Sequence, residues 1–170
     1  MNKILSVVLQ FVVLLAVQIL VCNHVNLFGF INPYIYILAI LLLPLDIPRP
    51  WQYIIAFFTG LTVDFFAMTY GVHASATLWV ALARPYLVRR LNGGKTTEAT
   101  ERPVPGVKDF RWLLVYAFLL VFLHHFAITL LETFNFREFF RTLTVSFINA
   151  LFTTTIVLCI EYIFFPLKKR

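Results

Sequence analysis

The chain has 170 residues, of which 61% are hydrophobic and 13% are charged, and its formal net charge is +6. A soluble domain is typically about 45–50% apolar and about 25% charged. The composition therefore excludes an ordinary soluble domain and predicts one transmembrane domain over residues 1–170. The basic residues lie mostly at the ends of apolar segments, as membrane topology requires, so the positive charge does not indicate nucleic-acid binding.

Six apolar segments are candidates to cross a bilayer, which takes about 20 residues. The first follows Lys3 and exceeds a signal-peptide core, with no small-residue cleavage site after it. The second contains Gly29, Pro33 and Pro44, so a tilted or re-entrant segment with a regular part at 34–43 is an alternative there. The fourth is predicted to kink or end near its proline. The predicted helices are 4–22, 27–45, 51–68, 73–91, 112–131 and 142–164.

The basic residues also predict the orientation of the bundle. The long polar segment 89–111 is rich in Lys and Arg, as is the C-terminus, whereas the opposite side would receive only Arg137 and Arg141. Because basic residues concentrate on the cytoplasmic side of membrane proteins, we expect both termini and the loop 89–111 to be cytoplasmic.

The hairpin of residues 51–90 carries one ionisable residue in each helix, Asp64 and Arg84, and turns near Gly71. A charge in such an apolar segment costs a few kcal/mol and usually faces the protein interior. Small residues share the faces of these charges, which favours close helix packing. The stripes are Ala56, Gly60, Asp64 and Ala67 in the first helix, and Ala74, Thr77, Ala81 and Arg84 in the second. The hairpin is either a packing interface alone or the functional centre of the protein.

Each buried charge has a predicted partner. Asp64 and His73 flank the turn, so we expect a buried pair that serves either structure or proton transfer. Arg84 lies nearer the cytoplasm, about 1.5 Å lower for each intervening residue. Glu161 of the last helix is at a better level than Asp64 to pair with it.

The remaining polar residues do not form a recognisable catalytic or metal-binding motif. His124 and His125 are adjacent and diverge by about 100° on a helix, and no HxxxH or CxxC spacing exists. We therefore predict no metal, no cofactor and no enzymatic activity. Cys22 and Cys159 are expected to be free thiols on opposite sides. The last helix has a polar stripe that indicates either interhelical hydrogen bonds or a solute path; it contains Thr142, Ser146, Asn149, Thr153 and Glu161.

A set of residues in a fixed order carries a resemblance to a known family. They are Gln18, the run VCNHVNLFG at 21–29, Pro33-Tyr34, Gly60, Asp64, Gly71, His73-Ala74 and Arg84-Pro85. With these, residues 1–165 resemble the rod-shape-determining membrane protein MreD as found in Bacteroidetes-like bacteria. The resemblance implies a non-enzymatic, multi-pass inner-membrane subunit of the cell-elongation machinery, which builds lateral peptidoglycan and regulates cell shape. The partners it implies are MreC, MreB, a RodA-type glycosyltransferase and a penicillin-binding transpeptidase.

The MreD family is also similar in fold to the six-helix substrate-binding subunits of vitamin transporters. That similarity implies an alternative function, a substrate-binding membrane subunit of an energy-coupled small-molecule transporter, with the polar helix faces lining its pocket. Membrane lipid is a further predicted partner, through the basic loop. Under either function the predicted set of interacting or buried polar residues is Gly60, Asp64, Gly71, His73, Arg84 and Glu161.

Overall fold

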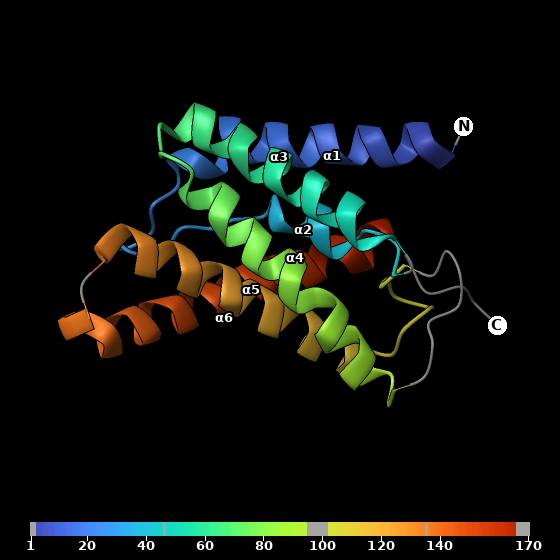
Figure 1. The fold of residues 1–170 in the computed structure, drawn as a ribbon. Helices are drawn as coiled ribbons and strands as arrows, with labels where there is room; N and C mark the ends of the chain where they lie inside the picture. Colours follow the sequence, from blue (N-terminus) through green and yellow to red (C-terminus); the bar gives the residue numbers. More distant parts are fainter. Residues whose placement is uncertain (1–2, 46, 95–101, 135, 166–170) are drawn as a thin grey trace.

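The computed structural model describes residues 3–45, 47–94, 102–134 and 136–165 (Figure 1). The chain is 76% helical and these residues contain no β-strand, so the all-α part of the predicted fold is confirmed. Two short 3₁₀ helices, η1 and η2, accompany the α-helices. In chain order the helices are α1 (Lys3–Leu20), η1 (Cys22–His24), α2 (Ile37–Leu41), α3 (Arg49–Ala67), α4 (Val72–Leu91), α5 (Phe110–Thr133), η2 (Phe136–Glu138) and α6 (Phe139–Phe164).

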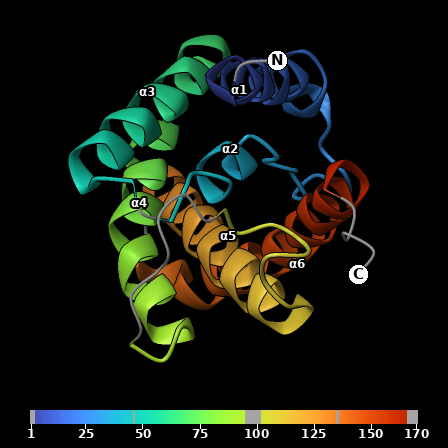
Figure 2. The same ribbon diagram turned by 90° about the vertical axis from the view of Figure 1, so that its right-hand side faces the viewer.

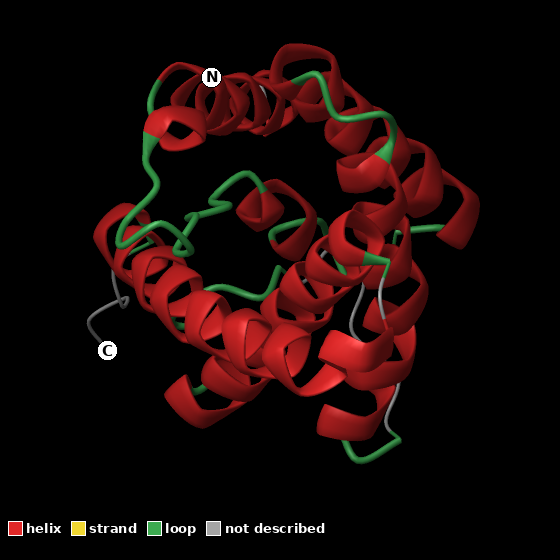
Figure 3. Cartoon of the chain, turned by 90° about the vertical axis from the view of Figure 1, so that its left-hand side faces the viewer, coloured by secondary structure: helices red, strands yellow, loops and turns green. Residues whose placement is uncertain are grey.

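The five long helices surround a short central one. Helices α3 and α4 form one antiparallel hairpin, α5 and α6 form another, and α4 packs along α5 (Figure 1). Views from the two ends of the bundle show α2 and the loops that lead to it inside the surrounding helices (Figures 2 and 3). Residues 36–43 are at most 4% exposed, so the centre of the molecule is an interrupted piece of backbone rather than a long helix.

The predicted spanning helix at 27–45 is therefore wrong, and only Ile37–Leu41 is α-helical. The chain first makes a turn, closed by two hydrogen bonds of 2.9 Å between the backbones of Leu27 and Ile31. Phe28 and Gly29 in this turn have positive φ angles, which an α-helix does not contain. Pro33 and Pro44 lack the backbone N–H that a helix interior requires. The predicted alternative of a regular part confined to 34–43 agrees better with α2, which lies inside that range.

Helices α3 and α4 begin and end where their residues allow. Pro50 lies in the first turn of α3, where a missing N–H is tolerated. Gly71, with φ of +85°, precedes α4. Helix α4 does not end at Pro85 and continues to Leu91. Pro85 cannot bind the carbonyl four residues earlier, and the side-chain amide of Gln52 donates to that Ala81 carbonyl instead, at 2.8 Å.

Two of the described helices, α5 and α6, are both long and apolar enough to cross a membrane. A shorter apolar helical stretch, Val8–His24, covers most of α1 and η1. Helix α5 starts at an Asp109 cap whose carboxylate accepts a hydrogen bond from the backbone N–H of Trp112 at 3.1 Å. Cys22 and Cys159 are free thiols, as predicted.

Candidate functional site

Asp64 lies buried near the end of α3 and binds the start of α4. Its Oδ1 accepts hydrogen bonds from the Thr69 hydroxyl (2.6 Å) and the His73 backbone N–H (3.0 Å), and its Oδ2 accepts from the Ala74 backbone N–H (2.8 Å). The first N–H groups of a helix lack intrahelical partners and carry partial positive charge, so a carboxylate there is stabilising. Asp64 and His73 therefore form a buried structural pair, as one of the two predicted alternatives has it, but the carboxylate binds the backbone N–H of His73, and the hydrogen bonds described for Asp64 do not include the imidazole.

Gly60 is the point of closest approach between α3 and α4. A Cβ atom on Gly60 would lie 2.5 Å from the Ala74 Cα and 2.6 Å from the His73 carbonyl oxygen, closer than real Cβ atoms come. At the same level the Thr77 hydroxyl donates to the Ala56 carbonyl at 2.9 Å. The small-residue stripes predicted from the sequence therefore do face one another, and they allow the two backbones to touch.

Arg84 is 1% exposed, and its guanidinium is surrounded by neutral acceptors. Its Nε donates to the Tyr116 hydroxyl at 2.7 Å, and that hydroxyl donates in turn to the Leu41 carbonyl at 2.9 Å. The other guanidinium N–H groups donate to a side-chain amide and to backbone carbonyls at the end of α2. These acceptors are Gln52 Oε1 (3.5 Å) and the carbonyls of Leu41 (3.5 Å), Leu43 and Pro44 (3.3 Å).

Arg84 thus binds the carboxyl end of α2, whereas Asp64 binds the amino end of α4. Carbonyls at a helix C-terminus have no intrahelical donor and favour a cation. Glu161, the predicted ion-pair partner, is not among the acceptors described for Arg84, and neither is Asp64. Glu161 is 1% exposed on α6, and its Oε2 has no hydrogen-bond partner in the described part of the chain.

A cluster of two tyrosines and three histidines fills the interior between α2, α4 and α5. The Tyr36 hydroxyl lies 3.0 Å from His73 Nδ1 and 2.6 Å from His124 Nε2. Because this hydroxyl has one proton, it donates to one ring nitrogen and accepts an N–H from the other. The Tyr34 ring stacks on His125 at 5.1 Å and meets His73 edge-on at 5.0 Å. The cluster therefore connects the residues before α2 with α4 of one hairpin and with α5 of the other.

Tyr34 is among the residues that carry the resemblance, but neither Tyr34 nor Tyr36 is in the predicted set of buried polar residues, because the sequence places both in a spanning helix, where residues two apart point in different directions. His124 and His125 do diverge as predicted: His124 binds Tyr36, whereas His125 Nε2 lies 2.9 Å from the Thr153 hydroxyl of α6.

We call residues 30–44 the central segment. The side-chain amides of Gln18 and Asn149 bind the backbone at its start. Gln18 of α1 donates to the Pro33 carbonyl (3.3 Å) and accepts from the Tyr36 backbone N–H (3.3 Å). Asn149 of α6 accepts from the Asn32 backbone N–H (2.8 Å) and donates to the Phe30 carbonyl (2.9 Å). The polar stripe of α6 is buried, and its member Asn149 binds the backbone of the central segment.

Two polar pockets open on either side of the start of the central segment. One, of about 210 Å³, lies between that segment and the α5–α6 hairpin, and His125, Glu132, Arg141 and Asn149 help to line it. The other, of about 330 Å³, lies toward α1 and the α3–α4 turn, and its lining includes Asn23, Thr69, His73 and Glu132. Asn32 and Tyr34 separate the pockets and line both.

The described residues contain no group of three His, Cys, Asp or Glu side chains arranged to hold a metal ion. Comparison with known protein families, curated proteins and solved structures gives no significant match to this chain. The chemistry of the site is therefore argued from its own contacts, which bind backbone groups inside the bundle and leave two open pockets at one end.

Proposed function

We propose that the chain spans a bacterial inner membrane several times, with both termini in the cytoplasm. Large apolar side chains cover the outer faces of the long helices, while the charged and polar ones described above are buried. A soluble monomer rarely exposes apolar patches larger than a few hundred Å². Only 33% of the most apolar window of α6 is buried inside the protein, which supports lipid contact for the rest. The exposed apolar residues include Val8, Val12, Phe58, Phe65, Leu119, Phe147, Leu151 and Ile163.

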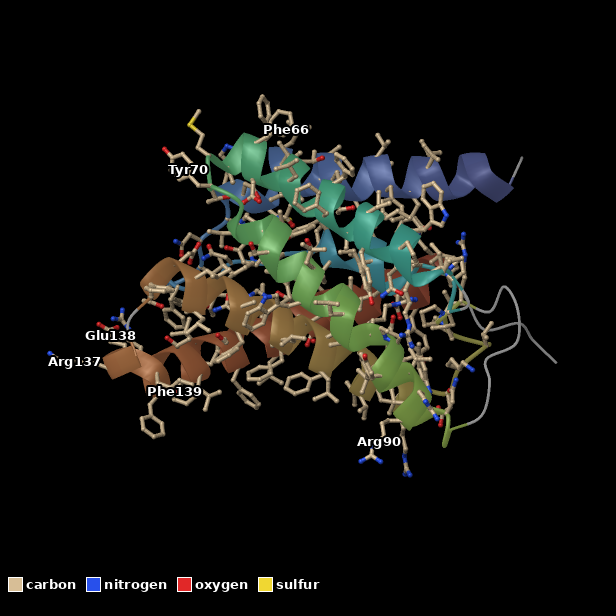
Figure 4. All side chains as sticks on the ribbon, in the orientation of Figure 1. Phe66, Tyr70, Arg90, Arg137, Glu138 and Phe139 are labelled. Carbon is tan, nitrogen blue, oxygen red and sulfur yellow. The ribbon has the colours of Figure 1, made fainter. Side chains whose placement is uncertain are left out.

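Charged side chains lie at both ends of the bundle, where a membrane-spanning chain would meet water. Glu138 and Arg137 lie near the α5–α6 turn at one end, and Arg90 lies at the other (Figure 4). The predicted topology places Thr97, in the loop 89–111, inside and Asn135, between the last two helices, outside, but both residues lie outside the described part of the chain. Tyr70, which is fully exposed at the α3–α4 turn, and Val107, which is 48% exposed in the opposite loop, take their place.

Cysteine accessibility tests this orientation. In a variant without native cysteines, a membrane-impermeant maleimide should label Tyr70→Cys in intact cells and should label Val107→Cys only after permeabilisation. Labelling of Val107→Cys in intact cells would overturn the proposed topology.

Within that membrane, we propose that the chain is an MreD-like, non-enzymatic subunit of the cell-elongation complex. It would support lateral peptidoglycan synthesis and cell shape by binding MreC, a RodA-type glycosyltransferase and a penicillin-binding transpeptidase, beside MreB. One observation carries the proposal: the residues on which the resemblance rests lie in the interior and connect the helices and the central segment to each other. Gln18 and Arg84 hold the central segment, whereas Gly60, Asp64 and His73 join α4 to α3 and to that segment.

The partner surface we propose is the end of the bundle that carries the two polar pockets. Their shared lining, Asn32, Tyr34 and Glu132, offers amide, hydroxyl and carboxylate groups to an extended chain of a partner outside the membrane. Because Gln18 and Asn149 fix the backbone beside these groups, the surface is preorganised, which lowers the entropic cost of binding.

The test is crosslinked co-purification from native membranes, followed by identification of the bound chains. We expect MreC and cell-wall synthases. At matched protein levels, Asp64→Asn and Arg84→Ala should impair complex formation and rod shape more than Phe57→Ala or Leu78→Ala, which change apolar side chains outside the polar network. Equal shape defects in the two pairs would contradict the proposed role of the hairpin.

The alternative function is substrate binding for an energy-coupled transporter, and the two pockets are the places where a small solute would bind. Their volumes, about 210 and 330 Å³, lie at or below the lower end of the range of small-molecule sites. Recovery of an energy-coupling subunit with its ATPases in the same co-purification would select this function in place of the elongation complex.

A further inference from the structure

We infer that a groove between α1 and α6 binds one acyl chain of a phospholipid, with the lipid phosphate on Arg102. The inference rests on the proposed membrane location, and it concerns a surface that the elongation-complex proposal does not use. The groove has a volume of about 310 Å³ and is separate from the two polar pockets.

The groove lies at an open seam in the ring of helices. Neighbouring helices pack side by side from α1 to α3, α3 to α4, α4 to α5 and α5 to α6, whereas the ribbons of α6 and α1 lie apart, with α2 inside the ring (Figure 2). The groove is lined by residues of α1, α2 and α6. Leu38 of α2 and Leu14 of α1 are nearly or fully buried and line this seam. A bundle in a bilayer would therefore present an apolar slot to the surrounding lipid.

The lining matches a hydrocarbon chain along most of its length. Leu9, Val13 and Leu14 come from α1, and Ile160, Phe164 and Phe165 come from the end of α6. An α-helix with its side chains is about 10 Å across, so a space of 310 Å³ does not accommodate a partner's transmembrane helix. A single flexible acyl chain fits such a slot.

One end of the groove is charged, which indicates the headgroup. Arg102 belongs to the loop at the end of the bundle where α1 begins and α6 ends (Figure 1), and it is the single charged residue among the groove residues described. In the proposed orientation this end lies at the cytoplasmic surface, where anionic lipids collect. A guanidinium binds phosphate oxygens with two parallel N–H groups, and Gln10 lines the same groove with an amide suited to the ester region.

The chain offers a matched pair of variants for the acyl site. Val13 and Val12 are adjacent on α1 and are similarly exposed, at 50% and 56%, but Val13 lines the groove and Val12 does not. Val13→Trp should fill the slot, whereas Val12→Trp should only add surface. For the headgroup, Arg102→Gln is compared with Arg90→Gln, which changes an exposed arginine outside the groove.

The experiment is native mass spectrometry of the full chain in detergent micelles that contain phosphatidylglycerol or phosphatidylcholine. We expect one retained phosphatidylglycerol on the wild type, with affinity lower by about fivefold in Arg102→Gln. We also expect loss of the retained lipid in Val13→Trp, and wild-type retention in Val12→Trp and Arg90→Gln.

Equal retention by Val13→Trp and Val12→Trp would overturn the acyl site, and equal retention by Arg102→Gln and Arg90→Gln would overturn the phosphate contact. Resistance of the protein to carbonate extraction from membranes is measured in parallel. A chain that stays in the membrane but fails the lipid test refutes only the groove, whereas a chain released by carbonate refutes the membrane proposal itself.

Discussion

Replacement of Arg84 by alanine should destabilise the protein strongly, because this one side chain binds several backbone groups at the end of α2. Leu41 keeps a donor in Tyr116 and Pro44 keeps the backbone N–H of Ile47, but the Leu43 carbonyl loses the guanidinium and no other donor to it is described. A buried polar group left without a partner costs about 1–3 kcal/mol. Arg84 is also among the largest fully buried side chains, so its removal leaves a cavity as well.

Removal of the buried charge offsets part of this loss. We therefore expect Arg84→Ala to lower the free energy of unfolding by about 3 kcal/mol or more. Arg84→Lys should cost less, since an ammonium keeps the charge and some hydrogen bonds but not the planar fork.

The assay is denaturant unfolding in a mild detergent, followed by tryptophan fluorescence. Trp112 reports on the site because its ring stacks on Tyr116 at 4.8 Å. Arg90→Ala is the control: Arg90 is exposed at the end of α4, so its loss should change stability by no more than about 0.5 kcal/mol. Arg84→Ala within 1 kcal/mol of this control would refute the assignment of Arg84 to the end of α2.

Three further variants test the other contacts in the same assay. Gly60→Ala should destabilise by about 1–3 kcal/mol, because its Cβ would lie 2.5 Å from the Ala74 Cα; Thr62→Ala on the same helix should not, and equal effects would argue against backbone contact there. Tyr36→Phe should cost about 2 kcal/mol or more, because the ring nitrogens of His73 and His124 lose their partner; no greater loss than in the fully exposed control Tyr70→Phe would contradict the network. Glu161→Gln should leave stability unchanged or raise it, because Oε2 has no hydrogen-bond partner in the described residues; a loss as large as that of Arg84→Ala would instead indicate an ion pair.

The helices of the α3–α4 hairpin could be predicted closely from the sequence. The predicted ranges 51–68 and 73–91 correspond to Arg49–Ala67 and Val72–Leu91, since long apolar runs separated by a glycine turn specify helices with little help from tertiary contacts. The stripe of small residues also predicted the facing surfaces, because helical periodicity fixes which residues share a face. Burial of Asp64 and Arg84 followed from the cost of charge in lipid.

The partners of these charges could not be predicted in the same way. Asp64 binds backbone N–H groups and Arg84 binds backbone carbonyls. Every residue has a backbone carbonyl and nearly every residue has a backbone N–H, so the residue types do not indicate which of these groups a charge will bind. Pairing between ionisable side chains, which predicted His73 and Glu161, takes no account of such backbone groups. The helix at 27–45 was wrong because hydropathy averages over a segment, whereas Pro33 and Pro44 act at single positions on the backbone.

Each of the two buried charges is placed at the end of a helix inside the bundle. A backbone that stops being helical inside an apolar bundle leaves N–H and C=O groups that no water can reach, so other side chains must bind them. The carboxyl end of α2 carries partial negative charge, and Arg84 is the cation placed there. The amino end of α4 carries partial positive charge, and Asp64 is the anion placed there. The sign of each charge therefore follows from the helix end that it faces. The backbone groups at that helix end stabilise each buried charge without a counter-ion.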